Sequence, residues 1–185
     1  MSEITPESLL KQIKKLEGKA LPPVHLWDPP LCSNISMKID REGRWYFMNS
    51  PINRKRMICL FSKVIRYDRD GSYYLVTPYE KIKLKVEDKP FYVIDFSIVG
   101  EGSEQIISFK TYTEDIFLLD KEHPLRIKVD KNTKQPSPYV LVRNNLEGLI
   151  SRNIFYKLVD IAKREVIKGS SRLGVWSKGL FFSIE

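Results

Sequence analysis

The sequence contains few of the residues that build redox or metal sites: two cysteines and two histidines in 185 residues. Cys32 and Cys59 are too few for a disulfide framework, and we expect both thiols to be reduced. His25 and Cys32 lie close together in the sequence, but Cys59 and His123 are distant from them, so no four-ligand zinc pattern is present. We therefore expect no metal and no cofactor.

Long apolar runs are also missing, since none approaches the roughly 20 residues of a membrane span. The first residues carry acids ahead of lysines and no apolar block, which is not the pattern of a secretory signal. The sequence has no Gly-x-Ser-x-Gly elbow, no Ser-x-x-Lys pair and no glycine-rich phosphate loop. These absences favour a cytoplasmic, non-enzymatic protein over the alternative of a hydrolase that acts on a phosphorylated small molecule.

Lysine and arginine are abundant, and they give the chain a net charge of +8. Acids and bases alternate along most of the sequence, and the only tight basic triplet is Arg54-Lys55-Arg56. This mixture favours an ordinary solvated surface, because nucleic-acid binding requires the lysines and arginines to gather on one face. We therefore expect neither a nucleic acid nor a membrane as a partner, and the composition leaves the oligomeric state open.

The hydrophobic pattern predicts many strands and three helices. The helices are expected over residues 6–17, from Ser50-Pro51 to about residue 65, and from Asn144 to about residue 168. Arg152 lies inside the third helix unless Gly148 breaks it. Strands are expected at residues 35–39, 44–48, 72–77, 81–86, 91–99, 105–111, 115–119, 125–129, 139–142 and in a final hairpin over 175–184. The pattern predicts an α+β fold with mainly antiparallel sheets, each with a packed helix.

A sparse internal repeat suggests two related domains. Ile52-x-Arg54 and Ile150-x-Arg152 lie 98 residues apart, and each stands in a predicted helix between a strand and a glycine turn. We therefore predict an internal duplication of a strand–helix–strand unit. The expected organisation is an N-terminal helix over residues 1–19, a first domain over 20–88 and a second domain over 89–185.

Two arginines and one proline-rich segment are candidates for ligand binding. Arg54 lies near a predicted helix start, which suits an anion, and Arg143 ends a strand just before the third helix. Salt bridges between layers are the alternative role for both. His25 and Trp27 lie between two proline pairs in PPVHLWDPPLC, where they can stack on a base or seal a domain interface.

Several of these segments resemble a bacterial family, domain of unknown function 1285. The resemblance extends from about residue 20 to the end, and the segments that carry it are Pro23–Pro30, Gly43-x-Trp45, Pro51-Ile52-x-Arg54, Leu60-Phe61-Ser62, Tyr74–Pro78 with Glu80-Lys81, Val86-Glu87-Asp88, His123-Pro124-Leu125, Pro138–Arg143 and Val175-Trp176-Ser177.

The resemblance implies a duplicated α+β architecture whose C-terminal half is superficially like a pleckstrin-homology fold. It further implies a small-ligand site between the halves, for a nucleotide-like molecule, and a role in signal transduction with a signalling protein as partner. It supplies no catalytic residues. The resulting hypothesis is a ligand sensor, with a pure protein-interaction module as the alternative, and the ligand-binding candidates are His25, Trp27, Arg54, Thr77, Lys81 and Arg143.

Overall fold

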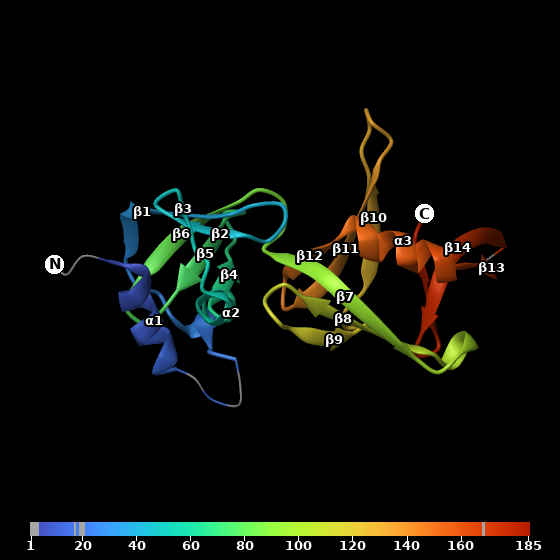
Figure 1. Ribbon diagram of the computed structural model, residues 1–185, viewed down its shortest axis with the longest axis horizontal. Coiled ribbons are helices and arrows are strands. Elements are labelled where there is room, and N and C mark those ends of the chain that lie inside the picture. The colour runs from blue at the N-terminus through green and yellow to red at the C-terminus, as the bar shows by residue number, and fades with distance from the viewer. Residues whose placement is uncertain (1–3, 17, 19–20, 168) are drawn as a thin grey trace. The chain divides into compact units, whose positions relative to one another are not determined.

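The computed structural model describes residues 4–16, 18, 21–167 and 169–185. The chain divides after Pro90 into two compact units, an N-terminal unit and a C-terminal unit, which are described separately (Figure 1). In the part of the chain that the structure describes, no helix is long and apolar enough to cross a membrane.

The N-terminal unit is built on a six-stranded sheet with the order β3-β2-β1-β6-β5-β4. The central pair, β1 and β6, is parallel, and every other pair is antiparallel. The sheet therefore consists of two antiparallel three-stranded meanders joined at their middle by one parallel pair. Its elements are α1 (Pro6–Lys14), the 3-10 helix η1 (Val24–Leu26), β1 (Leu31–Ile39), β2 (Trp45–Phe47), β3 (Ser50–Pro51), α2 (Lys55–Ser62), β4 (Ile65–Tyr67), β5 (Tyr73–Val76) and β6 (Lys81–Val86).

Helix α1 begins where its capping residues predict. Thr5 and Ser8 form a reciprocal capping box, in which each side chain accepts a hydrogen bond from the other residue's backbone N–H. Pro6 occupies the first turn, and Leu9 and Ile13 are buried. The helix ends at Lys14, whereas residue 17, its predicted end, lies outside the described residues.

The predicted start of the second helix at Ser50-Pro51 is wrong. These two residues form β3, which pairs antiparallel with β2, and α2 begins only at Lys55. The cause is a tight turn, because Met48 and Asn49 adopt positive φ angles of 46° and 64° and send the chain back along β2. Proline is tolerated in β3 because this strand lies at the edge of the sheet.

The C-terminal unit contains a second six-stranded sheet, with the order β10-β11-β12-β7-β8-β9, and a three-stranded sheet with the order β13-β14-β15. Again the central pair, β7 and β12, is parallel and the other pairs are antiparallel. The elements are β7 (Phe91–Val99), the 3-10 helix η2 (Gly102–Glu104), β8 (Ile106–Thr111), β9 (Ile116–Leu118), β10 (Leu125–Val129), β11 (Pro136–Arg143), β12 (Leu146–Ile150), α3 (Arg152–Ile161), β13 (Lys163–Ile167), β14 (Ser170–Ser177) and β15 (Leu180–Ser183).

The predicted long helix from Asn144 to residue 168 is also wrong, because only Arg152–Ile161 are helical among its described residues; residue 168 itself lies outside them. Residues 146–150 form the central strand β12, and Gly148 lets this strand pack closely against its neighbours, β7 and β11. A Cβ atom on Gly148 would lie 3.1 Å from Val142 Cγ2 and 3.2 Å from Phe91 Cβ, so a larger residue would have to push these neighbours apart by a few tenths of an ångström. Ser151 then caps α3, and Arg152 is the first helical residue.

The two six-stranded sheets have the same topology. When the strands of each are numbered from one to six along the chain, both sheets follow the order 4-5-6-1-2-3, with strands 1 and 6 parallel. The helices do not follow this correspondence, since α2 comes after the third strand of its sheet and α3 after the sixth. The strand order therefore does not match the 98-residue repeat predicted from Arg54 and Arg152.

Candidate functional site

The segment Pro22–Pro30, called the proline strap below, leads from α1 toward β1. Within it, Val24 and Pro29 are buried, His25 is exposed, and Trp27 is partly exposed. Leu26 is 72% exposed. The backbone forms a single 3-10 turn in which the Trp27 N–H donates to the Val24 carbonyl at 3.4 Å. The strap thus combines a buried anchor with solvent-facing side chains.

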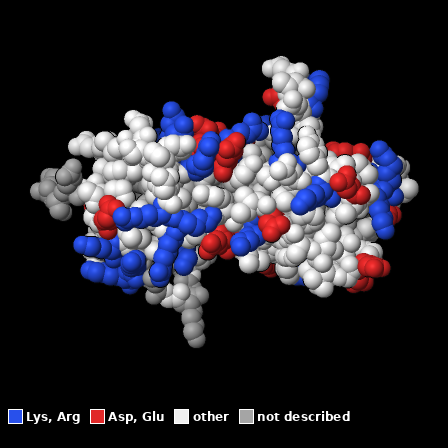
Figure 2. All heavy atoms as spheres, in the orientation of Figure 1, with Lys and Arg blue, Asp and Glu red and all other residues white. Residues whose placement is uncertain are grey.

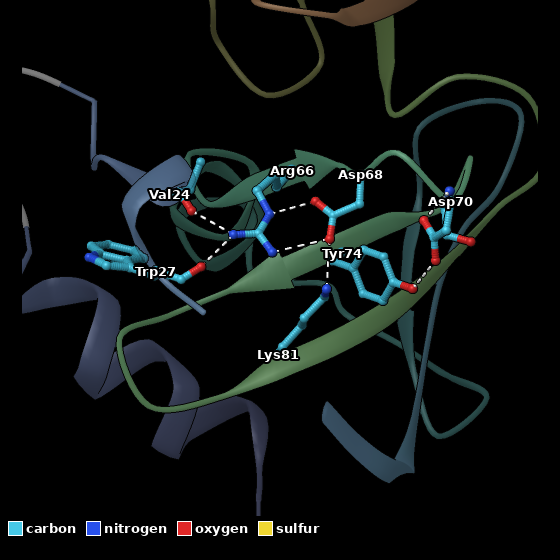
Figure 3. Close-up of polar contacts among 8 residues, drawn as sticks. Val24, Trp27, Arg66, Asp68, Asp70, Tyr74 and Lys81 are labelled. Atoms are coloured by element: carbon cyan, nitrogen blue, oxygen red, sulfur yellow. Dashed lines mark hydrogen bonds and ion pairs between the residues drawn. The ribbon is translucent and has the colours of Figure 1, made fainter. Parts of the chain in front are cut away.

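Arg66 on β4 fastens the strap to the sheet of the same unit. Its Nη1 donates to the carbonyl oxygens of Val24 at 2.8 Å and Trp27 at 2.5 Å (Figure 3). Its Nε and Nη2 donate to both carboxylate oxygens of Asp68, at 2.6 and 3.1 Å. The guanidinium group therefore binds the carboxylate in a bidentate manner while its other side satisfies two backbone carbonyls.

Asp68 connects this anchor to β6. Lys81 Nζ donates to Asp68 Oδ2 at 2.6 Å and lies 4.1 Å from the centroid of the Tyr74 ring. Partial burial raises the pKa of Asp68, but the hydrogen bonds from Arg66 and Lys81 outweigh it and hold the pKa below its ordinary value. The hydroxyl of Tyr74 donates to Asp70 at 2.6 Å, and this hydrogen bond raises the pKa of Tyr74 (Figure 3).

The structure thus brings together two of the predicted site residues, Trp27 and Lys81, through the two residues that sequence reasoning missed. Arg66 lies on β4 and Asp68 directly follows the strand, and extended backbone places residues two apart on the same side. This Arg-x-Asp spacing is the feature of the sequence that could have indicated the pair. Since Lys81 is only 18% exposed and contacts Asp68 and Tyr74, its charge is already compensated within the protein.

Thr77 lies close to Lys81 in the sequence, but its contacts give it a structural role. Its side chain is fully buried, and its hydroxyl donates to Gln12 Oε1 at 2.8 Å. The same hydroxyl oxygen accepts hydrogen bonds from the backbone N–H groups of Tyr79 and Glu80, at 3.3 and 3.1 Å. Gln12 also donates to the carboxylate of Glu80 at 3.1 Å. Thr77 therefore ties α1 to the turn between β5 and β6.

Arg54 occupies a separate place, at the N-terminal end of α2. It is the N-cap residue and contributes no capping hydrogen bond from its side chain. The guanidinium forms an ion pair with Glu7 of α1 at 3.2 Å, in which the two side chains are 70% and 58% exposed. The residue lines a surface pocket of about 310 Å³ together with Pro6, Glu7, Phe47, Ser50, Pro51, Ile52, Asn53 and Met57. Arg54 thus combines an exposed cation with an adjoining pocket.

Arg143 belongs to the C-terminal unit. Its side chain is 13% exposed, pairs with Asp115 and lies with its guanidinium carbon 4.7 Å from the centroid of the Phe91 ring. Asp115 also accepts hydrogen bonds from the hydroxyls of Thr113 at 2.7 Å and Thr111 at 3.1 Å. The sequence left a salt bridge between layers open as the alternative role of Arg143, and the observed salt bridge instead joins two parts of the same six-stranded sheet. That Arg143 and Arg54 share one site stays a prediction.

The comparisons with known proteins agree with the resemblance seen in the sequence. Residues 22–89 match the family model described as "Domain of unknown function (DUF1285), N-terminal domain", and residues 90–184 match "Protein of unknown function (DUF1285), C-terminal domain". The comparison with curated proteins gave no match.

Two crystal structures are similar to this chain. A DUF1285 family protein from Silicibacter pomeroyi DSS-3 is 39% identical, with a TM-score of 0.82 over 95% of this chain and 93% of the other. One from Shewanella baltica OS155 is 22% identical, with a TM-score of 0.54 over 68% of this chain and 91% of the other, and shows a likeness of fold. The chain therefore belongs to the DUF1285 family, and both family domains are present in it.

Proposed function

We propose that the protein is a non-enzymatic ligand sensor whose N-terminal unit binds a small phosphate-bearing, nucleotide-like molecule beside Arg54. The observation that carries this proposal is the position of Arg54, exposed at the start of α2 and lining a pocket of about 310 Å³. A pocket of this size lies at the lower end of the range for small-molecule sites.

The charge distribution around the start of α2 supports an anionic ligand. The first turn contains Lys55 and Arg56 and no acid, and a helix N-terminus attracts anions through its dipole and its first N–H groups. Glu7 is the carboxylate that a ligand would displace from Arg54. Because both side chains are exposed, their ion pair is worth no more than about 1 kcal/mol, so a phosphate can replace it.

The remaining candidates have different roles in this proposal. Phe47 and Met57 supply apolar surface within the pocket lining, where the ring of a nucleotide can pack. His25 and Trp27 are absent from that lining, and their contact with a ligand stays a prediction. A ligand placed between the two units likewise stays a prediction, as does the signalling role.

A thermal-shift screen with inorganic phosphate, nucleoside monophosphates and sugar phosphates tests the proposal. At a ligand concentration 100 times Kd, binding stabilises the folded state by about 2.7 kcal/mol, which raises Tm by several degrees. We expect this shift to disappear in Arg54→Ala and to persist in Arg69→Ala, which removes an exposed arginine from the β4–β5 turn. The absence of a shift with every compound, or equal shifts in Arg54→Ala, would contradict the proposal.

The exposed face of β7, β8 and β9 favours the second candidate function, a protein-interaction module. Val99 pairs directly with Ile106, and both are exposed, by 69% and 36%. Ile116 and Leu118 on β9 are 71% and 36% exposed and extend this apolar face. Exposed apolar residues gathered on one sheet face often mark a protein contact. A screen without ligand shifts, combined with weaker self-association or partner capture in Ile116→Glu, would favour this function.

We further infer that the two units arose by duplication of the six-stranded sheet. Support comes from the shared strand order and from the first strands, Leu31–Ile39 and Phe91–Val99, which have equal length. A structure-based alignment of the two sheets in several family members tests this inference, which requires the same strand correspondence in each. The likeness of the C-terminal unit to a pleckstrin-homology fold stays a prediction.

A further inference from the structure

The surface formed by α1, α2 and their capping residues, called the basic face below, concentrates positive charge. Figure 2 shows Lys and Arg gathered over the part of the N-terminal unit where Figure 1 places these two helices. The two helices pack against each other, so their side chains contribute to one surface. Its basic residues are Lys11, Lys14, Lys15, Arg54, Lys55, Arg56 and Lys63.

Acidic side chains are few among the described residues of the two helices and their caps. Among the described residues of the basic face, Glu7 is the only acid, and it pairs with Arg54. The excess of basic over acidic residues is also larger in the N-terminal unit when all residues of each unit are counted. Lysine and arginine outnumber aspartate and glutamate by 17 to 11 in residues 1–90, but only by 14 to 12 in residues 91–185. The gathering of basic residues that nucleic-acid binding requires is therefore present in the N-terminal unit.

The side chains of the basic face suit some anionic partners better than others. Both helices are described throughout, and neither exposes a large apolar or aromatic side chain, since Leu9, Ile13, Met57 and Phe61 are buried. A helix that inserts into a membrane surface presents apolar side chains outward, and proteins that hold single-stranded nucleic acid present aromatic rings for stacking. The basic face offers neither, and it is suited to contacts with charge alone.

Phosphate chemistry favours a nucleic-acid backbone. Exposed lysines on the helices supply mobile point charges, Arg56 supplies a guanidinium fork, and the start of α2 supplies a helix N-terminus, all of which are common contacts to phosphodiester groups. We propose that the basic face binds the phosphate backbone of a double-helical nucleic acid, without sequence specificity, through Lys11, Lys14, Lys15, Arg56 and Lys63. This function goes beyond the small-ligand site and does not use Arg54.

Fluorescence anisotropy with a labelled 20-base-pair DNA or RNA duplex tests the proposal on the full chain. Non-specific binding of this kind has Kd values on the order of 10⁻⁶ to 10⁻⁴ M, and log K falls with log salt by about 0.9 for each neutralised phosphate. Five contacts therefore predict a slope of about −4 to −5 between 50 and 200 mM salt. We expect the triple variant Lys11→Gln, Lys14→Gln, Arg56→Gln to bind at least tenfold more weakly, with a slope smaller by about 2 to 3.

A variant with the same loss of charge elsewhere provides the control. Lys128, Lys131 and Lys134 are exposed on the β10–β11 hairpin of the C-terminal unit. Changing all three to Gln should leave affinity and salt slope nearly unchanged. Equal weakening by the two triple variants would show that net charge alone acts and would overturn the proposal. No binding at 50 mM salt would overturn it as well. Tighter, basic-face-dependent binding to vesicles containing 30% phosphatidylserine than to either duplex would assign the face to lipid instead.

Discussion

The guanidinium of Arg66 donates a hydrogen bond of 2.5 Å to the backbone carbonyl of Trp27, a residue 39 positions earlier in the chain. This contact fixes the position of the backbone and leaves the Trp27 ring partly exposed. The proline pairs limit the conformations of the unfolded segment, so little additional entropy is lost when Arg66 fastens it. The proline strap is therefore held by its backbone rather than by burial of its tryptophan.

Replacing Arg66 with Met should release the proline strap and destabilise the N-terminal unit by about 2 to 3 kcal/mol, because Asp68 loses its bidentate partner and two carbonyls lose their donor. Hydrogen-exchange mass spectrometry should show faster exchange of residues 24–27. Arg69→Met removes an exposed arginine nearby and should leave exchange in this segment unchanged. Unaltered protection in Arg66→Met would show that the strap is held by other contacts.

Thr77→Val should destabilise the N-terminal unit by about 1 to 2 kcal/mol, because the buried hydroxyl serves Gln12, Tyr79 and Glu80 at once. Thr77→Ser keeps the hydroxyl and should retain most of the stability. Urea unfolding of the two variants measures the difference. A Thr77→Val variant of normal stability that loses a ligand-induced thermal shift would instead assign this residue to ligand binding.

Asp115→Asn should destabilise the C-terminal unit by about 3 kcal/mol, because it removes the carboxylate that pairs with the largely buried charge of Arg143. The double variant Asp115→Asn, Arg143→Met removes both charges and should be less destabilised than the sum of the single variants. Thermal unfolding of the four proteins in this double-mutant cycle measures the coupling. Glu114→Gln, an exposed neighbouring change, is the control, and additive effects would contradict a coupled pair.

Asp120 predicts a pH dependence in the C-terminal unit. Partial burial raises its pKa, but hydrogen bonds from Lys178, His123 and backbone N–H groups prevail and lower the pKa from 3.8 to about 2. Since the folded-state pKa is the lower one, ionised Asp120 stabilises the fold above pH 3.8, and this contribution is lost as the pH falls through about 2. Asp120→Asn should therefore cost about 2 kcal/mol at pH 7 and progressively less below pH 3.8.

Urea unfolding at pH 7, 4 and 2.5 checks this dependence, with Glu122→Gln as an exposed control close to the same turn. A stability difference between the wild-type protein and Asp120→Asn that stays constant across these pH values would contradict it.

The alternation of apolar residues predicted most strands accurately, because in most of them one face is more buried than the other. Lys81–Val86, Phe91–Val99 and Leu125–Val129 match the structure residue for residue. The pattern failed for Leu146–Ile150, because nearly every position of this central strand is buried and its apolar run has no strand period. The turn at Met48 and Asn49 was missed because neither residue is glycine, although both adopt positive φ.

The candidate site was less predictable, because it depends on which side chains meet across the fold. Lys81 and Arg143 were ligand-binding candidates, but their carboxylate partners, Asp68 and Asp115, lie 13 and 28 residues away in the sequence. Arg54, by contrast, is exposed and lines a pocket. Its helix begins later than predicted, and the residue is consequently the N-cap rather than a residue of the first helical turn.

The parallel pair at the middle of each sheet has a consequence for synthesis on the ribosome. In the N-terminal unit, β1 cannot pair with β6 until the chain has emerged through Val86, and β7 must likewise wait for Ile150. Until then, each sheet exists at most as a three-stranded meander with an open inner edge that can pair with other chains. Each sheet is therefore most exposed to aggregation until its last strand, β6 or β12, has been synthesised and has paired.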